Sequence, residues 1–148
     1  MVIVTLAVVV LRYGLSIGSV ALQESITYMH AAVFLLGAAY TLKRDGHVRV
    51  DIFYRKFSPT RQAWVNAIGG IVFLLPLCAF MVFISWDFAA SSWRIREASG
   101  NADGIPAVFL LKSMIPLMAI TLALQGLAET LKSLLILIDG SEQEASDD

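Results

Sequence analysis

Long uncharged runs divide this chain into apolar segments that short polar stretches separate. The longest run, Gln62 to Trp86, holds 25 residues without a charge, and Ser25 to Leu42 holds 18. A helix needs about 20 apolar residues to cross the hydrocarbon core of a bilayer. Ser113 to Ala128 supplies 16 more, and this run lengthens if Lys112 snorkels to the interface and Glu129 faces protein. The pattern predicts membrane-spanning helices.

The opening apolar run is shorter than the others. Met1 to Leu11 would rise only about 16 Å at 1.5 Å per residue, against a hydrocarbon core about 30 Å thick. We expect either a helix that tilts into protein or a chain start that clips a longer natural helix, and we favour clipping. The run lacks a basic region and a small-residue cleavage site, so we interpret it as a retained segment and not as a signal peptide.

Together these runs predict an all-α membrane protein with four transmembrane helices, over residues 1–13, 23–42, 59–86 and 105–138. Residues 1–140 form a single transmembrane helical domain, and the acidic residues 141–148 form a disordered tail. Ser58 and Pro59 predict the start of the third helix, because serine is a favoured N-cap and proline a favoured first helical residue. Pro76 lies inside that helix and is its candidate kink.

A short charged segment lies between the second and third spans. Its HVRVDIF sequence alternates polar and apolar residues, which by period alone predicts a strand. A lone strand at a membrane surface would have no partner for its backbone. At helical spacing, one apolar face gathers Val50, Phe53, Tyr54 and Phe57. We therefore expect a short amphipathic interfacial helix over residues 50–57, after a turn at Asp45-Gly46.

The charge distribution predicts the orientation of the chain. Six basic residues lie within positions 43–61, and basic residues in short loops mark the cytoplasmic side. Both termini are then expected to be cytoplasmic. The six residues are candidate contacts for lipid headgroups at the cytoplasmic interface: Lys43, Arg44, Arg49, Arg55, Lys56 and Arg61.

Composition agrees with a membrane location. Hydrophobic residues make up 57% of the chain and the mean hydropathy is +0.72, whereas ordinary soluble domains are about 45–50% apolar. The net charge is −1, and no basic face of a folded soluble module indicates binding of nucleic acid. The single Cys78 lies in an apolar run, so cysteine usage predicts neither a disulfide framework nor a metal cluster.

Two histidines are the candidates for binding a metal or a cofactor. His30 lies within the second span, as a haem or quinone ligand would in a membrane anchor of a respiratory complex, but His47 lies in the loop at the wrong depth for a second axial ligand. A hydrogen-bonded histidine in helix packing is the preferred interpretation of His30. His47 with Asp45 and Asp51 matches no strong metal motif. We expect no metal and no cofactor.

Glu24, at the start of the second span, has two interpretations. A buried glutamate in an early helix would exchange protons in a small drug–proton antiporter, but a carboxylate favoured by the dipole at a helix N-terminus is the simpler interpretation. No nucleophile–base pair or phosphate loop appears, and few charged groups lie within the spans. We expect neither an enzyme nor a complete transporter, and a haem- or quinone-associated membrane anchor stays the alternative.

Asp87, Arg94, Arg96 and Glu97 follow the third span. They form either a solvated helix end or a helix that continues to Ala98, projects past the bilayer and docks a partner.

Several stretches of the chain match a known family in order and spacing. They are LRYGL (11–15), QE (23–24), FLLGAAYTLKRDGHVRVDIF (34–53), GIPAVFLLKSMIP (104–116) and LALQGLAE (122–129). Over nearly its whole length the sequence resembles the small membrane subunit (Q-type, DctQ-like) of tripartite ATP-independent periplasmic (TRAP) transporters.

The resemblance implies four membrane helices plus an interfacial helix, with both termini cytoplasmic, in the cytoplasmic membrane of a bacterium or archaeon. It also implies two protein partners. A large M-type membrane subunit would carry the substrate and sodium sites, and a periplasmic substrate-binding protein would deliver a carboxylate solute for sodium-coupled uptake. The small subunit would brace the large one and help to dock the binding protein.

This resemblance gives the charged and small residues expected roles. Arg94, Arg96 and Glu97 would face the periplasm and are candidates for docking the binding protein. Small residues permit close approach of helices. The candidates for packing within the subunit or against the large one are Gly37, Ala38, Ala39, Gly69 and Gly70.

Overall fold

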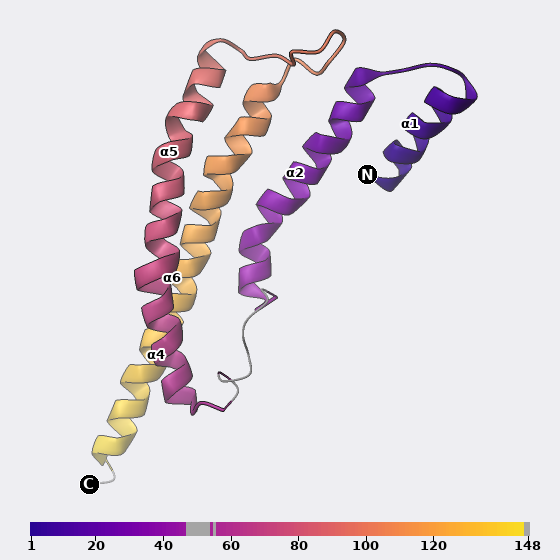
Figure 1. Cartoon of the computed structure of the whole chain (residues 1–148). Coiled ribbons are helices and arrows are strands. Elements are labelled where there is room, and N and C mark those ends of the chain that lie inside the picture. The colour runs from indigo at the N-terminus through magenta and orange to yellow at the C-terminus, as the bar shows by residue number, and fades with distance from the viewer. Residues whose placement is uncertain (47–53, 55, 147–148) are drawn as a thin grey trace. The chain divides into compact units, whose positions relative to one another are not determined.

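The computed structural model describes residues 1–46, 54 and 56–146, and its elements within these residues are all helices (Figure 1). They are α1 (Val2–Gly14), α2 (Val20–Lys43), α4 (Pro59–Gly69), the π-helical turn η1 (Gly70–Leu74), α5 (Leu75–Arg94) and α6 (Val108–Ser146). Three of the described stretches are long and apolar enough to cross a membrane: Val20–Lys43, Pro59–Arg94 and Val108–Ile138. The expectation of an all-helical chain with long apolar spans is confirmed.

α2 begins three residues before the expected position. The hydroxyl of Ser19 accepts a hydrogen bond from the N–H of Leu22 at 3.3 Å and so caps the helix start. The helix ends at the expected turn, where the N–H of Gly46 bonds to the carbonyl of Thr41 at 2.9 Å. Asp45 adopts the left-handed conformation there, with φ of 54°, the place that glycine usually takes at a helix end.

The third span begins as the sequence predicts and runs further than expected. Ser58 accepts a hydrogen bond from the N–H of Arg61 at 3.4 Å, and Pro59 is the first helical residue. The irregularity expected at Pro76 takes the form of a π-helical turn just before it, closed by the N–H of Leu75 on the carbonyl of Gly70. A proline ring clashes with the carbonyl four residues earlier in a regular helix, and a wider turn relieves that clash.

α6 differs from expectation at both ends. It begins at Val108 and not at residue 105, because Pro106 disfavours the helical conformation of Ile105 before it. It runs to Ser146, so residues 141–146 of the tail are helical where disorder was expected. Glutamate, glutamine and alanine in that segment favour a helix. Most of the expected interfacial helix, at residues 50–53 and 55, lies outside the described residues.

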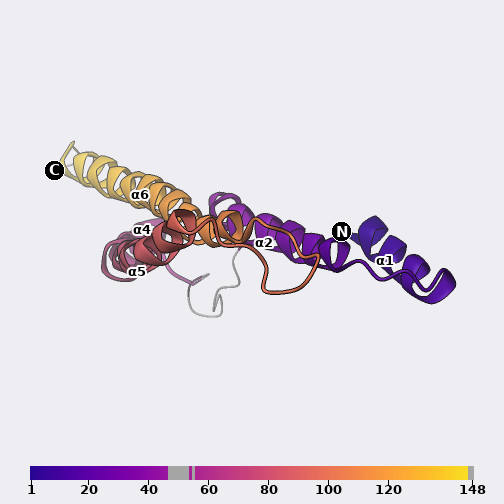
Figure 2. The same ribbon diagram turned by 90° about the horizontal axis from the view of Figure 1, so that it is seen from above.

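The chain divides into two compact units. The first unit consists of Met1–Gly37 and Val82–Met118. In it, α1 runs antiparallel to the first part of α2, and the end of α5 lies beside the start of α6 (Figure 1). Seen from above, the connection between α5 and α6 reaches across to the first turns of α2 (Figure 2). This connection, residues 95–107, is called the α5–α6 connection below.

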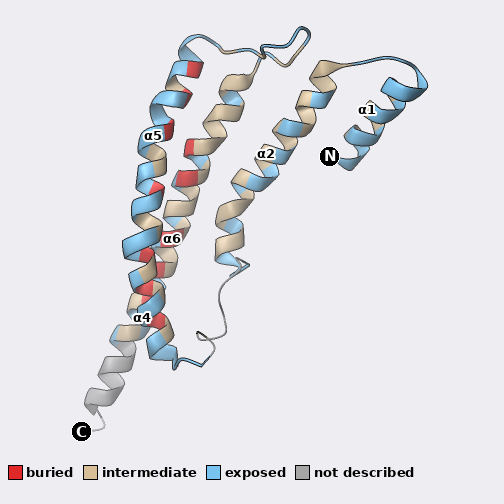
Figure 3. Cartoon of the chain, viewed as in Figure 1, coloured by how far each residue is buried: buried red, intermediate tan, exposed pale blue. Residues whose placement is uncertain are grey.

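The second unit consists of Ala38–Met81 and Ala119–Asp148. Its buried positions, marked in Figure 3, are mostly small residues, which let two helix backbones approach closely. The buried hydroxyls of Thr130 and Ser133 donate to the carbonyls of Gly126 and Glu129 at 2.8 and 3.0 Å. The buried residues include Ala63, Ala67, Gly70, Cys78, Ala119, Gly126, Thr130 and Ser133.

Candidate functional site

Helix α5 stops at a defined end and does not continue to Ala98. The N–H of Glu97 bonds to the carbonyl of Ser92 at 3.0 Å, and that of Arg96 bonds to the carbonyl of Trp93 at 3.3 Å. Arg96 adopts the left-handed conformation, with φ of 47°. This hydrogen-bond pattern is that of a Schellman motif, which satisfies the last carbonyls of a helix and turns the chain away from its axis.

Aromatic side chains hold the exposed Arg96 in place. Its guanidinium carbon lies 5.4 Å from the ring centre of Trp93 and 5.5 Å from that of Phe109, both within the range of cation–π attraction. The two rings meet edge to face with centres 4.6 Å apart. The indole N–H of Trp93 also donates to the hydroxyl of Ser113 at 2.6 Å. The end of α5 is therefore fastened to the first turns of α6.

Glu97 is engaged within the chain by an ion pair. The ammonium of Lys112 donates to its carboxylate at 2.6 Å and lies 4.2 Å from the ring centre of Phe88. The hydrogen bond from Lys112 holds the pKa of the Glu97 carboxyl below its ordinary value. Of the three residues expected to dock a binding protein, Arg94 and Arg96 are exposed, and the carboxylate of Glu97 is bound by Lys112.

The carboxylate of Glu24 gathers three donors from the α5–α6 connection. One oxygen accepts hydrogen bonds from the hydroxyl of Ser99 and, at 3.0 Å, from the side-chain amide of Asn101. The other oxygen accepts the backbone N–H of Ile105 at 2.7 Å. Hydrogen bonds to an ionised acceptor are stronger than those between neutral groups. Glu24 and its three donors are called the Glu24 clasp below.

Gly104 makes room for the Glu24 clasp. A Cβ atom added at Gly104 would lie 2.5 Å from the Cβ of Ser99 and 2.9 Å from a carboxylate oxygen of Glu24. Real Cβ atoms do not approach other heavy atoms so closely. A side chain at position 104 would therefore push Ser99 away from Glu24 and open the clasp.

The helix-dipole interpretation of Glu24 is wrong. Because α2 begins at Val20, Glu24 is its fifth residue, and the first turn of α2 holds no acidic side chain. The charge of Glu24 is matched by donors from another part of the chain. One signal of this role was visible in the sequence, a single carboxylate at the edge of an apolar helix, but the sequence did not show which segment supplies the donors.

The small residues expected in helix packing have different surroundings. A Cβ added at Gly70 would overlap the hydroxyl oxygen of Thr130 and lie 3.3 Å from its Cβ, so Gly70 permits close contact between η1 and α6. Gly37 and Gly69 have open space around the added atom. Ala38 and Ala39 are half-buried. Gly70 therefore packs within the chain, whereas no atom of the chain packs against the added Cβ at Gly37 or Gly69.

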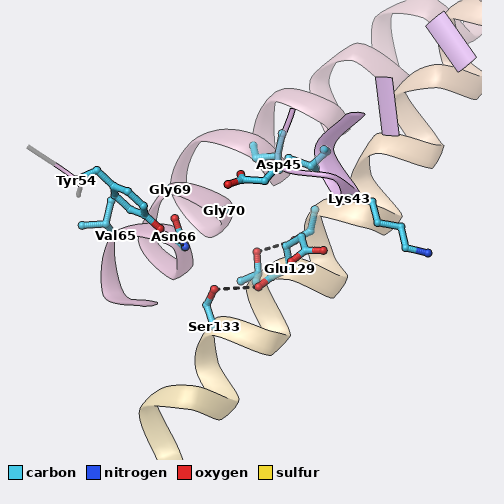
Figure 4. Close-up of a pocket in the computed structure, with 13 residues that line it drawn as sticks. Lys43, Asp45, Tyr54, Val65, Asn66, Gly69, Gly70, Glu129 and Ser133 are labelled. Atoms are coloured by element: carbon cyan, nitrogen blue, oxygen red, sulfur yellow. Dashed lines mark hydrogen bonds between the residues drawn. The ribbon is translucent and has the colours of Figure 1, made fainter. Parts of the chain in front are cut away.

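A hollow of about 390 Å³ lies in the second unit, between the end of α2, η1 and α6 (Figure 4). On its rim the side-chain amide of Asn66 donates to the hydroxyl of Tyr54 at 2.8 Å. Asp45 and Glu129 also line it. In the described part of the chain, no group of three histidine, cysteine, aspartate or glutamate side chains is placed to hold a metal ion.

Four of the six candidate headgroup contacts are described, and all four are exposed: Lys43, Arg44, Lys56 and Arg61. Arg44 donates from Nε to the hydroxyl of Tyr40 at 3.1 Å, and its guanidinium carbon lies 5.5 Å from the centre of that ring. Arg49, Arg55, His47 and Asp51 lie outside the described residues.

Comparison with known proteins identifies the family. The family model described as "Tripartite ATP-independent periplasmic transporters, DctQ component" matches residues 1–135, which include the Glu24 clasp and every described helix up to the last turns of α6. No curated protein matches the chain, and no solved structure matches it. Members of this family are components of membrane transporters, and the family is not one of enzymes. The family and the three long apolar helices of the described residues both indicate a membrane protein. The chain belongs to the DctQ family of tripartite ATP-independent periplasmic transporters.

Proposed function

We propose that this chain is the small membrane subunit of a TRAP importer, which braces a large M-type transport subunit and presents the α5–α6 connection to a periplasmic substrate-binding protein. The observation that carries the proposal is the fastening of that connection at two points and of the α5 end just before it at a third. Glu24 holds the connection to α2, Lys112 holds Glu97 to α6, and Ser113 holds Trp93, near the end of α5, to α6. A docking surface held in one conformation loses less entropy when a partner binds.

The proposed topology has four transmembrane helices, with α1 as the first, in a single domain over residues 1–140. Both termini lie in the cytoplasm, and the α5–α6 connection faces the periplasm of a bacterial or archaeal cell. The exposed basic residues at the end of α2, just after it and around the start of α4 support this orientation, since such residues stay on the cytoplasmic side. They are Lys43, Arg44, Lys56 and Arg61.

The proposed docking surface is cationic. Arg94 and Arg96 are exposed at the end of α5, and stacking against Trp93 and Phe109 orders the guanidinium of Arg96. The negative charge of Glu97 does not fully offset the positive charge of these two arginines, because Lys112 binds its carboxylate. Carboxylates on the binding protein are the complementary partners, and guanidinium groups suit them because they donate two parallel hydrogen bonds.

Sodium-coupled uptake of a carboxylate solute is proposed for the complete complex. The test is uptake into proteoliposomes that contain this chain, the M-type subunit and the binding protein, under a sodium gradient. We expect uptake with all three components and none with this chain alone. Uptake by this chain alone, or unchanged uptake when it is omitted, contradicts the proposal.

Charge-removing variants test the docking surface within the same complex. The double variant Arg94→Gln and Arg96→Gln is expected to weaken binding of the binding protein about tenfold, because it removes two cations from the interface. Arg61→Gln, at the other end of the third span, is the matched control and is expected to leave that binding unchanged. Equal effects of the two changes contradict a docking role for Arg94 and Arg96.

A further inference from the structure

In the first unit, helix α2 exposes polar side chains along one face. Thr27 and His30 are exposed, one helical turn apart, and His30 is the eleventh of the 24 residues of α2. Val33 and Phe34 continue the same face and are 68% and 72% exposed. The imidazole of His30 stacks on the ring of Phe34 with centres 6.2 Å apart. Within the described part of the chain, no hydrogen bond reaches that imidazole.

The other two long apolar stretches, Pro59–Arg94 and Val108–Ile138, have exposed faces unlike that of α2. Between Trp64 and Trp86, every exposed residue of α4, η1 and α5 is apolar. On α6, each exposed residue from Leu117 to Leu131 is a leucine or an isoleucine. Lipid chains can cover such faces at no cost in lost hydrogen bonds. These helices present surfaces suited to lipid, and α2 does not.

His30 also lies at the edge of an apolar groove. A groove of about 510 Å³ runs between α1 and α2, and its apolar walls include Val2, Leu6 and Val9 from α1 and Ile26 from α2. His30 supplies the imidazole at its border. The groove and the exposed face of α2 therefore form one continuous surface with a polar group near its centre.

Lipid chains cannot supply a hydrogen-bond partner to the imidazole on this surface. A polar group buried in hydrocarbon without a hydrogen-bond partner is unfavourable, and polar residues within membrane helices almost always face protein or a water-filled cavity. A transmembrane helix of another protein can fill the groove with apolar side chains and offer one hydrogen-bonding group to the imidazole. The open space around Gly37, one turn beyond Phe34, would let such a helix approach α2 closely.

We infer that the α2 face of Thr27, His30 and Phe34, with the α1–α2 groove, is the surface that binds the M-type subunit, and that a hydrogen-bonding side chain of that subunit meets His30. The inference rests on the proposed function, because it takes the large subunit as the partner. It adds which helix faces that subunit and which chemistry the contact requires.

Two exposed phenylalanines provide a matched crosslinking experiment. A photoreactive phenylalanine analogue replaces Phe34 on α2, which is 72% exposed, or Phe83 on α5, which is 81% exposed. Each full chain is expressed with the M-type subunit and irradiated in the membrane. We expect position 34 to form an adduct with the M-type subunit and position 83 to form adducts with lipid.

The outcomes separate the inference from the proposed function. If the two wild-type subunits do not purify together, the proposed function fails and the inference fails with it. If they do, an adduct of position 34 with lipid, with a second copy of this chain or with another part of the same chain overturns the inference, as does capture of the large subunit from position 83 alone. If both positions capture the M-type subunit, the inference for the α2 surface stands, and only the expectation that α5 faces lipid is wrong.

Substitution of His30 tests the hydrogen bond. A hydrogen bond between membrane helices is worth about 1 kcal/mol, so His30→Leu is expected to weaken retention of the M-type subunit about fivefold. His30→Gln keeps a hydrogen-bonding side chain and is expected to restore part of that retention. Thermal unfolding of each variant chain alone is the control for folding, and His30→Leu is expected to be no less stable than wild type. Full retention with His30→Leu overturns the proposed hydrogen bond.

Discussion

The backbone N–H of Ile105 donates to the carboxylate of Glu24 at 2.7 Å, although 81 positions separate the two residues in the sequence. Ser99 and Asn101 donate to the same carboxylate. A side chain of α2 therefore binds the α5–α6 connection, which also has backbone hydrogen bonds of its own, such as that from the N–H of Ser99 to the carbonyl of Ile105 at 3.2 Å. A change at the start of α2 should alter a connection that lies far from it in the sequence.

Glu24→Ala is expected to release the α5–α6 connection, because it removes the acceptor of three hydrogen bonds at once. The amide of Ile105 should then exchange with deuterium several-fold faster in detergent, while the amides in the middle of α6 keep their protection. Gln23→Ala, one residue earlier on an exposed position, is the matched control and should leave exchange at Ile105 unchanged. Unchanged exchange in Glu24→Ala contradicts the Glu24 clasp.

The difference between what the sequence predicted and what it missed has a physical basis. The start of the third span and the turn after α2 were predicted, because Ser58-Pro59 and Asp45-Gly46 act through their own neighbouring backbone. The role of Glu24 was not, since its partners lie in a distant segment. Local patterns predict helix ends well, whereas a contact between segments depends on how they pack.

Acidification is expected to loosen the attachment of Glu97 to Lys112. The pKa of Glu97 is lowered in the folded chain by the hydrogen bond from Lys112. A carboxyl whose pKa is lower in the folded than in the unfolded state contributes stability above its unfolded pKa and loses that contribution as the pH falls through the folded pKa. The contribution should be constant near neutral pH and decline below the ordinary pKa of glutamate.

Amide exchange at Val108 measures this effect, because the N–H of Val108 donates to the carbonyl of Glu97 at 3.1 Å. We expect its protection to fall in acid more steeply in wild type than in Glu97→Gln, once intrinsic exchange rates are corrected. Glu129→Gln is the control, since its exposed pair with Lys132 lies in the second unit. The same pH profile in wild type and Glu97→Gln contradicts a role for this ion pair.

Gly70→Ala is expected to destabilise the second unit. The added Cβ would overlap the hydroxyl of Thr130, and overpacking of a well-packed contact typically costs about 1–3 kcal/mol. Gly69→Ala is the matched control, because its added Cβ meets open space, and alanine favours a helix over glycine. Thermal unfolding in detergent should show a lower midpoint for Gly70→Ala than for Gly69→Ala.

A second substitution identifies the source of that destabilisation. Thr130→Ala removes the hydroxyl that the new Cβ would meet, so it should recover part of the stability of Gly70→Ala. The interaction between two contacting residues is visible as such non-additivity. Purely additive effects of the two changes would mean that Gly70 does not pack on Thr130.

The sequence predicted Gly70 as a packing residue but treated Gly69 and Gly70 alike. Adjacent residues of a helix point about 100° apart, so only one of two neighbouring glycines can face a given partner. Which one it is depends on the rotation of the helix about its axis. That rotation is set here by α6 and is not encoded in the glycine pair itself.

The proposed topology predicts the location of a reporter. A fusion after Asp148 should be active as a cytoplasmic reporter, because the basic residues that follow α2 keep both termini on that side. A second fusion after Gly100, within the α5–α6 connection, should be active only as a periplasmic reporter. Periplasmic activity of the fusion after Asp148 contradicts the topology.

Arg96→Gly separates the stability of the α5 end from its proposed binding role. Arg96 has φ of 47°, a conformation that glycine adopts without the steric cost that a side chain incurs. The variant should therefore keep the Schellman motif, and thermal unfolding of the chain should be little changed or slightly higher. It removes the guanidinium that stacks on Trp93 and Phe109, so affinity for the periplasmic binding protein should fall.

Arg96→Ala removes the same charge but retains the strained conformation, so it should lose the same affinity with a lower unfolding midpoint. Equal affinity of wild type and Arg96→Gly contradicts docking through Arg96, because the helix end itself would be intact.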